Sequence, residues 1–234
     1  MRAIRSVLFL ALFYAWGVFW VFFILPLLVC PRRWTVRSFA IWGFGIMLLL
    51  RAICGIRVEV RGREFIPRGR ALIAPKHQSM FDVFAQFVWL PDSCFVTKKE
   101  LMWIPMFGWY AKKAQMIEVD RGGHAKALRK LVVDAKGRFA DERQLVIFPE
   151  GHRGEPGVAG DYKPGIAALY REIDVSVCPV ATNSGAHWPR KGWLSPGTIV
   201  FEYLEPIPPG LKRAEFMRIL EERIETASLR LLAF

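Results

Sequence analysis

An apolar stretch without a single charged side chain lies between Arg5 and Arg32, and it constrains the fold more than any other feature. Its centre, residues 8–30, reads LFLALFYAWGVFWVFFILPLLVC. As a helix rising ~1.5 Å per residue, a run of this length covers the ~30 Å hydrocarbon core of a bilayer. A secretory signal peptide is disfavoured, because its apolar region would be shorter and no small-x-small cleavage site precedes Pro31. The stretch therefore predicts a membrane-associated helix.

A second apolar run, residues 38–50, follows after a short basic linker. Bounded by Arg37 and Arg51, it would reach only about 20 Å as a helix, which is too short for a comfortable return crossing. It predicts an interfacial or re-entrant helix. The linker combines arginines with a tryptophan, which is typical of the cytoplasmic headgroup region.

Two arrangements of these helices stay open. Either the first helix spans the bilayer, or both helices lie as a hairpin in one leaflet, which Pro26 slightly favours because it interrupts the first run. In both arrangements the basic linker keeps the rest of the chain on the cytoplasmic side.

The distribution of charge agrees with a membrane surface. The 234-residue chain has a net charge of +12, and residues 1–63, with nine arginines and one glutamate, contribute +8 of it. A cationic excess within an apolar segment is typical of contact with anionic lipid, and it disfavours nucleic-acid binding, which needs a basic face interleaved with aromatic residues. The four cysteines are far apart, so they predict free thiols and no metal site.

From Arg57 onward, short β-branched and aliphatic runs alternate with longer helical ones. This pattern predicts an α/β fold with a mixed, largely parallel sheet flanked by helices. We divide the chain into a membrane-associated helical segment, residues 1–56, and a globular domain, residues 57–234. Strands are expected at residues 58–60, 71–74, 93–97, 116–119, 145–148, 175–180 and 198–203. Helices are expected at residues 82–90, 100–113, 123–139, 164–173 and 213–232.

Three polar clusters fall just after predicted strands, at residues 77–82, 118–121 and 148–153. In open α/β sheets, ligands bind beyond the carboxyl ends of the strands. We therefore expect these clusters to converge on one site.

The first cluster pairs an imidazole with a carboxylate. His77 lies in a strand-to-helix loop, and Asp82 stands five residues later at the start of a helix. A carboxylate that accepts the Nδ1 proton leaves Nε2 available as a general base. The alternative is a loop histidine with structural partners beside an N-cap aspartate.

The third cluster ends a buried strand with a rigid proline, a carboxylate and a glycine. Arg153 follows within hydrogen-bonding reach of an anionic ligand. The alternative is a surface turn with a weak Glu-Arg pair.

These residues carry a resemblance to a known family. HQSMFD resembles the H-x4-D motif of the glycerolipid acyltransferases, and FPEGHR resembles their FPEGTR motif. The similarity extends over residues 57–205 in the family's order and is greatest to the bacterial 1-acyl-glycerol-3-phosphate acyltransferases, which make phosphatidic acid. The further matching blocks are Lys98-Lys99-Glu100-Leu101, Pro105, Phe107-Gly108-Trp109, Ile117-Glu118-Val119-Asp120-Arg121 and Cys178-Pro179-Val180-Ala181.

The resemblance implies a role for each matching residue. His77 would be the general base and Asp82 its orienting carboxylate. The residues implied to hold the substrate phosphate are Arg121 and Arg153, with Lys98 or Lys99 as a further cation. The residues implied to shape the glycerol and acyl sites are Glu150, Gly151, Pro179 and Val180. Glu150 would meet the acceptor hydroxyl or position Arg153, while Pro179 and Val180 would line the acyl channel.

The implied reaction transfers an acyl group directly from an acyl thioester to the sn-2 hydroxyl of lysophosphatidic acid. The donor would be acyl-CoA or acyl carrier protein, and no cofactor, metal or acyl-enzyme is expected. The sequence has no G-x-S-x-G elbow, and Ser79 is too close along the chain to form an obvious triad with His77. The place implied is the inner (cytoplasmic) membrane, with the catalytic domain facing the cytoplasm.

Two departures from the family pattern leave the acceptor headgroup open. Lys76 stands where asparagine is frequent, and His152 stands where threonine is frequent. Another lysolipid, such as a lyso-ornithine lipid, is therefore an alternative acceptor. A non-catalytic, membrane-anchored lipid-binding scaffold is the alternative outside enzymes.

Overall fold

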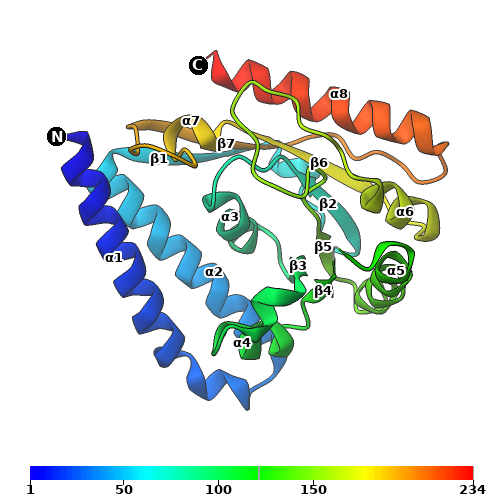
Figure 1. Ribbon diagram of the computed structural model, residues 1–234, viewed down its shortest axis with the longest axis horizontal. Coiled ribbons are helices and arrows are strands. Elements are labelled where there is room, and N and C mark those ends of the chain that lie inside the picture. The colour runs from blue at the N-terminus through cyan, green and yellow to red at the C-terminus, as the bar shows by residue number, and fades with distance from the viewer. Residues whose placement is uncertain (121, 234) are drawn as a thin grey trace.

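A seven-stranded sheet runs through the computed structural model, which describes residues 1–120 and 122–233 (Figure 1). The strand order is β1-β7-β6-β2-β5-β3-β4, and β6–β7 is the antiparallel pair among otherwise parallel neighbours. The predicted mixed, largely parallel sheet is confirmed. The strands are β1 Ile56–Arg61, β2 Ala71–Pro75, β3 Ser93–Lys98, β4 Ile117–Val119, β5 Gln144–Val146, β6 Val177–Thr182 and β7 Gly197–Tyr203.

Helices cover both faces of the sheet, because the central strands are buried on both sides. In β2, Ala71 and Ile73 join the core shared with α3, whereas Leu72 and Ala74 join the core beneath α5, α6 and α8. These helices are α3 Phe81–Trp89, α5 His124–Ala140, α6 Pro164–Glu172 and α8 Arg213–Leu232.

Two long apolar helices precede the sheet and form a hairpin. They are α1, Arg2–Phe23, and α2, Arg32–Leu49, which a π-helical turn extends to Cys54. By length and composition both could cross a membrane. The first helix agrees with the prediction, but the expectation of a short second helix is wrong. The helix starts at Arg32, directly after the extended residue Pro31, and the Arg32 side chain has a partner in the globular part.

The partner of Arg32 is Asp92, at the amino end of β3. The guanidinium makes two hydrogen bonds of 2.5 and 2.8 Å to the Asp92 carboxylate. Asp92 also accepts a hydrogen bond of 3.2 Å from Arg143, whose side chain is fully buried. This ion-pair chain fixes the bend of the hairpin to the sheet.

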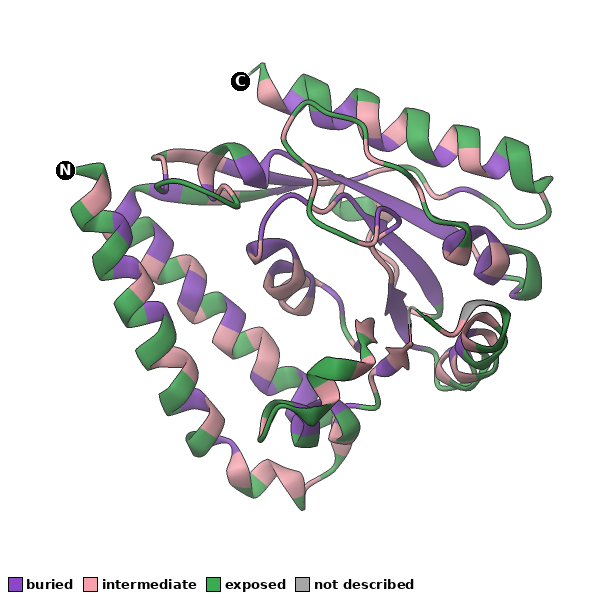
Figure 2. Ribbon diagram, viewed as in Figure 1, coloured by how far each residue is buried: buried purple, intermediate pink, exposed green. Residues whose placement is uncertain are grey.

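The hairpin is apolar on both its inner and its outer side. On the inner side Phe9, Phe13, Ile46 and Leu50 belong to the same buried cluster as the sheet residue Ile73. The outer face of α1 is exposed and apolar (Figure 2). Its exposed large residues are Ile4, Val7, Leu8, Leu12, Tyr14, Val18, Phe19, Phe22 and Phe23.

The predicted helix at residues 100–113 is divided in the structure. A 3-10 helix, η4, covers Lys99–Trp103, and α4 covers Phe107–Lys113. Pro105 explains the break, since it lacks a donor N–H and disfavours a helical residue before it. Ile104 is accordingly extended, at φ −67° and ψ 121°. The short helix α7, Ser184–His187, was not predicted.

Candidate active site

Four adjacent parallel strands, β2, β5, β3 and β4, end at one edge of the sheet and carry the polar clusters there. His77 follows β2, and Glu150 follows β5, which is the neighbour of β2. Lys98 ends β3, and Asp120 follows β4 at the outer edge. The expected convergence is confirmed for the first and third clusters, while the second lies two strands beyond the third.

The imidazole of His77 is held by a buried carboxylate. Its Nδ1 lies 3.1 Å from Oδ2 of Asp82, which is fully buried in the first turn of α3. The same oxygen accepts the backbone N–H groups of Gln78, at 2.6 Å, and Ser79, at 2.7 Å. Because Oδ2 of Asp82 acts as the acceptor here, it favours the tautomer of His77 that carries its hydrogen on Nδ1.

An aromatic contact also orients the His77 ring. The His77 ring stacks on Phe148, with centroids 4.2 Å apart and an angle of 26° between planes. The side chain remains 15% exposed, and Nε2 has no protein partner within the described residues. Nε2 is therefore available as a hydrogen-bond acceptor.

Glu150 points inward, away from solvent. Its Oε1 accepts the backbone N–H of His77 at 3.3 Å and lies 3.6 Å from Nζ of Lys76. Its Oε2 is buried without a hydrogen-bond partner among the described residues. Burial raises the pKa of Glu150, and the Lys76 ammonium offsets part of that rise. Glu150 thus supports the backbone of His77.

Lys76 ties this loop to the C-terminal helix. It is fully buried, and its Nζ donates to both carboxylate oxygens of Glu225, at 2.7 and 2.8 Å, and to the carbonyl of Val158, at 3.2 Å. Tyr162 donates a further bond of 2.9 Å to Glu225. The sequence carried no local signal for this network, because Lys76 and Glu225 are 149 residues apart.

The loop after β5 closes tightly around Glu150. Gly151 has φ +69°, a left-handed conformation that favours glycine. At Gly160 a Cβ would lie only 2.4 Å from Oε2 of Glu150. The backbone N–H of Gly154 donates to the His77 carbonyl at 2.8 Å. Because these residues are small, the loop can pack closely around the buried Glu150 carboxylate. Its hydrogen bond to His77 also holds the loop after β2 in place.

The predicted cationic residues lie around this edge. Lys99 forms an ion pair with Asp120, which raises the pKa of Lys99 and lowers that of Asp120. Lys98 and Arg153 are exposed, and Arg153 has no partner within the described chain. Arg121 lies outside the described residues. Their phosphate-binding roles stay predictions.

The predicted acyl-channel residues lie inside the sheet. Pro179 and Val180 are buried in β6, where they pair with Ala74 and Pro75 of β2. The Val180 carbonyl accepts the N–H of Lys76 at 2.8 Å. These residues position the His77 loop from the side opposite β5, and their contact with an acyl chain stays a prediction.

Ser79, Cys94 and Cys178 lack the features of an activated nucleophile. The Ser79 hydroxyl is buried, donates to Asp82 at 3.1 Å and accepts the N–H of Phe81 at 3.1 Å. Burial raises the pKa of Cys94, and it raises that of Cys178 to about 12, so both thiols are protonated at neutral pH. None of these three side chains is therefore arranged as an activated nucleophile.

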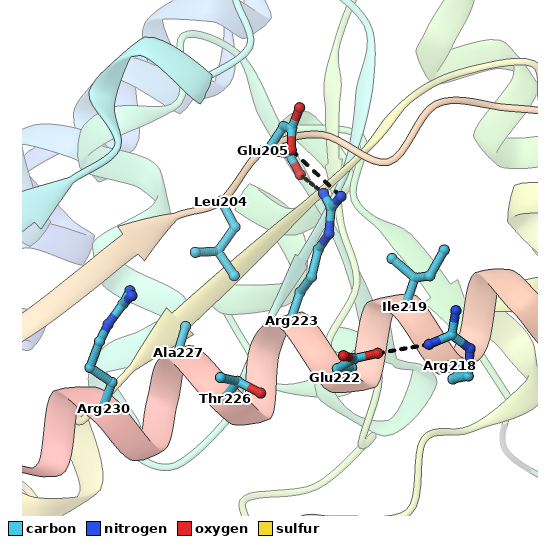
Figure 3. A pocket seen from close by; sticks show the side chains of 9 residues that line it. All are labelled: Leu204, Glu205, Arg218, Ile219, Glu222, Arg223, Thr226, Ala227 and Arg230. Atoms are coloured by element: carbon cyan, nitrogen blue, oxygen red, sulfur yellow. Dashed lines mark hydrogen bonds and ion pairs between the residues drawn. The ribbon is translucent and has the colours of Figure 1, made fainter.

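A groove of about 580 Å³ along α8 shares no residue with this cluster (Figure 3). Its arginines are occupied: Arg218 pairs with Glu222 at 2.8 Å, and Arg223 donates to the carbonyl of Glu205 at 2.6 Å. The lining residues are Leu204, Glu205, Arg218, Ile219, Glu222, Arg223, Thr226, Ala227 and Arg230. The carboxylates of Glu222 and Glu205 pair with these two arginines, and the groove residues named here include no histidine.

Comparison with known proteins shows the family to which this chain belongs. Residues 57–183, which contain both polar loops of the base, match the model of the Acyltransferase family, and the chain belongs to that family. It is 36% identical over 208 residues to the 1-acyl-sn-glycerol-3-phosphate acyltransferase of Pseudomonas aeruginosa, covering 85% of this chain and 78% of that protein. Its fold is similar to the crystal structure of the 1-acyl-sn-glycerophosphate (LPA) acyltransferase PlsC from Thermotoga maritima. That match has a TM-score of 0.81 at 23% identity and covers 100% of this chain and 99% of the other.

Proposed function

We propose that this chain transfers an acyl group from an acyl thioester to the free sn-2 hydroxyl of lysophosphatidic acid, giving phosphatidic acid. The observation that carries the proposal is the His77–Asp82 pair, with Nδ1 held at 3.1 Å and Nε2 open. The Pseudomonas aeruginosa relative, similar over most of both chains, supports the acceptor.

The proposed mechanism is direct transfer. Nε2 of His77 removes the proton of the acceptor hydroxyl as its oxygen attacks the thioester carbonyl, forming a tetrahedral oxyanion. The imidazolium that results is stabilised by the buried charge of Asp82, at 3.1 Å from Nδ1. Collapse of the intermediate breaks the carbon–sulfur bond, and the proton on Nε2 passes to the departing thiolate. The base returns to its neutral tautomer, ready for another acceptor.

The acceptor phosphate is assigned to exposed cations at the same edge of the sheet. Arg153 follows the Glu150 loop and has no partner within the described chain, so its guanidinium can form a bidentate contact with phosphate. Lys98, exposed at the end of β3, supplies a second charge. Lys99 is less available because it pairs with Asp120.

Membrane association follows from where the acceptor resides. Lysophosphatidic acid is a bilayer lipid, and the apolar outer face of α1 would lie in the cytoplasmic leaflet of the inner membrane as one arm of a hairpin. Arg33 and Arg37 are exposed on α2 and would meet anionic headgroups, whereas Arg32 is committed to Asp92.

The test is acylation by the purified, detergent-solubilised chain, read by mass spectrometry. Lysophosphatidic acid is compared with other lysolipids, including lyso-ornithine lipid, with acyl-CoA and acyl carrier protein as donors. We expect phosphatidic acid as the main product and its loss in a folded His77→Ala variant. Acylation of a different lysolipid with no activity on lysophosphatidic acid would contradict the proposal.

A further inference from the structure

A second apolar element lies beside the hairpin, in the segment of residues 98–113. Its sequence is KKELMWIPMFGWYAKK, an apolar run bracketed by two pairs of lysines. We call this segment the interfacial turn. Cations at both ends of a run rich in tryptophan are typical of a segment lying in the headgroup region of a bilayer.

The interfacial turn exposes large apolar side chains. Trp103 is 84% exposed and Trp109 is 54% exposed. Ile104 and Phe107 are exposed between them. A group of exposed apolar side chains bordered by charged residues is typical of a contact surface, because its exposure to water is unfavourable.

Two unusual backbone features of the interfacial turn favour this exposure. Met106 adopts φ 66°, which is rare for a residue with a side chain, at the turn between η4 and α4. A Cβ at Gly108 would lie 2.0 Å from the carbonyl oxygen of Met102, so only glycine allows the two helices to approach so closely. The tight turn keeps the apolar side chains facing outward.

The interfacial turn is continuous with the hairpin. The hydroxyl of Tyr110 donates to the carbonyl of Val21 at 2.7 Å, and the Tyr110 ring packs in a buried cluster with Trp20 and Ile24. The turn also begins where β3 ends, at the edge of the sheet that carries His77 (Figure 1). It therefore connects the bend of the hairpin to the active edge.

We propose that the interfacial turn inserts Trp103, Ile104, Phe107 and Trp109 into the same anionic phospholipid leaflet as the hairpin. The flanking lysine pairs then lie among the headgroups, and the active edge is held against the surface from which the acceptor arrives. This inference rests on the proposed function only in assigning the purpose of the contact.

Insertion is measured directly with a fluorescent label. In a Cys30→Ser background, which removes the one partly exposed thiol among the described cysteines, Trp103→Cys is labelled with an environment-sensitive dye. The labelled full chain is bound to vesicles of phosphatidylcholine and phosphatidylglycerol that contain nitroxide lipids. We expect a blue shift and strong quenching at position 103. Leu229→Cys, 52% exposed on α8, is the matched control and should stay unquenched. An unquenched label at position 103 would overturn the proposal.

Activity measurements distinguish a loss of membrane insertion from a general loss of structure. For a Trp103→Glu/Trp109→Glu variant we expect unchanged vesicle binding, because the hairpin remains, and about a 10-fold lower rate on bilayer-embedded lysophosphatidic acid. Its rate on a short-chain, water-soluble acceptor should stay within about 2-fold of the wild type, and Leu229→Glu should change neither rate. Equal losses on both acceptors would overturn the proposal. If the wild type acylates no lysolipid, the proposed function is wrong. The quenching measurement then still tests whether the interfacial turn inserts into the bilayer.

Discussion

Replacing Asp82 with asparagine isolates the charge of the carboxylate beside the base. In the structure Oδ2 of Asp82 receives hydrogens from Gln78 N, Ser79 N and Nδ1 of His77, at 2.6, 2.7 and 3.1 Å. Asparagine must keep its oxygen at that position, because an amide NH₂ would face three donors. The amide nitrogen then donates to the Ser79 hydroxyl, which lies 3.1 Å from Oδ1. The tautomer of His77 is preserved and only the charge is lost.

The expected loss in rate follows from that difference. A hydrogen bond to a charged group contributes ~1.5–3 kcal/mol and a neutral one ~0.5–1.5 kcal/mol, so the transition state loses ~1–1.5 kcal/mol. This corresponds to about a 5- to 13-fold lower kcat, against at least ~100-fold for His77→Ala. Single-turnover acylation of a short-chain acceptor at saturating donor measures both. A loss above ~1000-fold for the asparagine variant would refute the reasoning, because it would mean that the wrong tautomer forms.

The remaining predictions concern acceptor binding, the buried ion pairs and the hairpin. Arg153→Ala should raise KM for the acceptor by about 10- to 150-fold with no change for the donor, and lysine should rescue poorly, as acceptor and donor titrations would reveal. Lys76→Met should lower the free energy of unfolding by ~3–5 kcal/mol in urea titrations, since it leaves the α8 carboxylate unpaired; a change under ~1 kcal/mol would contradict the network. Burial alone would raise the pKa of Asp92, but the flanking arginines outweigh it and lower that pKa. Its stabilising effect is thus present above about pH 4 and lost as the pH falls through the lowered value, and Asp92→Asn should flatten this acid limb of stability. Deleting residues 1–50 should give an unfolded product in near-ultraviolet circular dichroism, because Phe9 and Ile46 complete the core; a folded, active product would show that the core does not need them.

Much of the fold was predictable because local pattern and tertiary burial agree. The alternation of short strands and helices predicted the sheet, and the position of His77 after one strand and Glu150 after another predicted their convergence. Strand order decides how close such clusters come, and that order is not local information. The predicted helix at residues 100–113 was too long, because Pro105 interrupts it.

The parts that escaped prediction depend on contacts distant in sequence. The family resemblance implied that Glu150 meets the acceptor hydroxyl or positions Arg153; its contacts with the backbone of His77 and with Lys76 were not predicted. Arg32 was expected among lipid headgroups, but Asp92, 60 residues away, holds it. Charge type and spacing cannot reveal such partners, since each lone charge has many possible partners along the chain.

Helix α3 connects the hairpin to the His77–Asp82 pair. Helix α3 carries Asp82 in its first turn and packs on α2, where a Cβ at Gly43 would lie 3.0 Å from the carbonyl of Phe84. The ring of Trp42 meets Phe84 edge-on, with centroids 4.6 Å apart. The second helix of the hairpin is thereby in contact with the helix that carries Asp82. The hairpin and the interfacial turn consequently have different roles. The hairpin is part of the scaffold on which the His77–Asp82 geometry depends. The interfacial turn, as proposed above, affects only how the site meets the lipid surface.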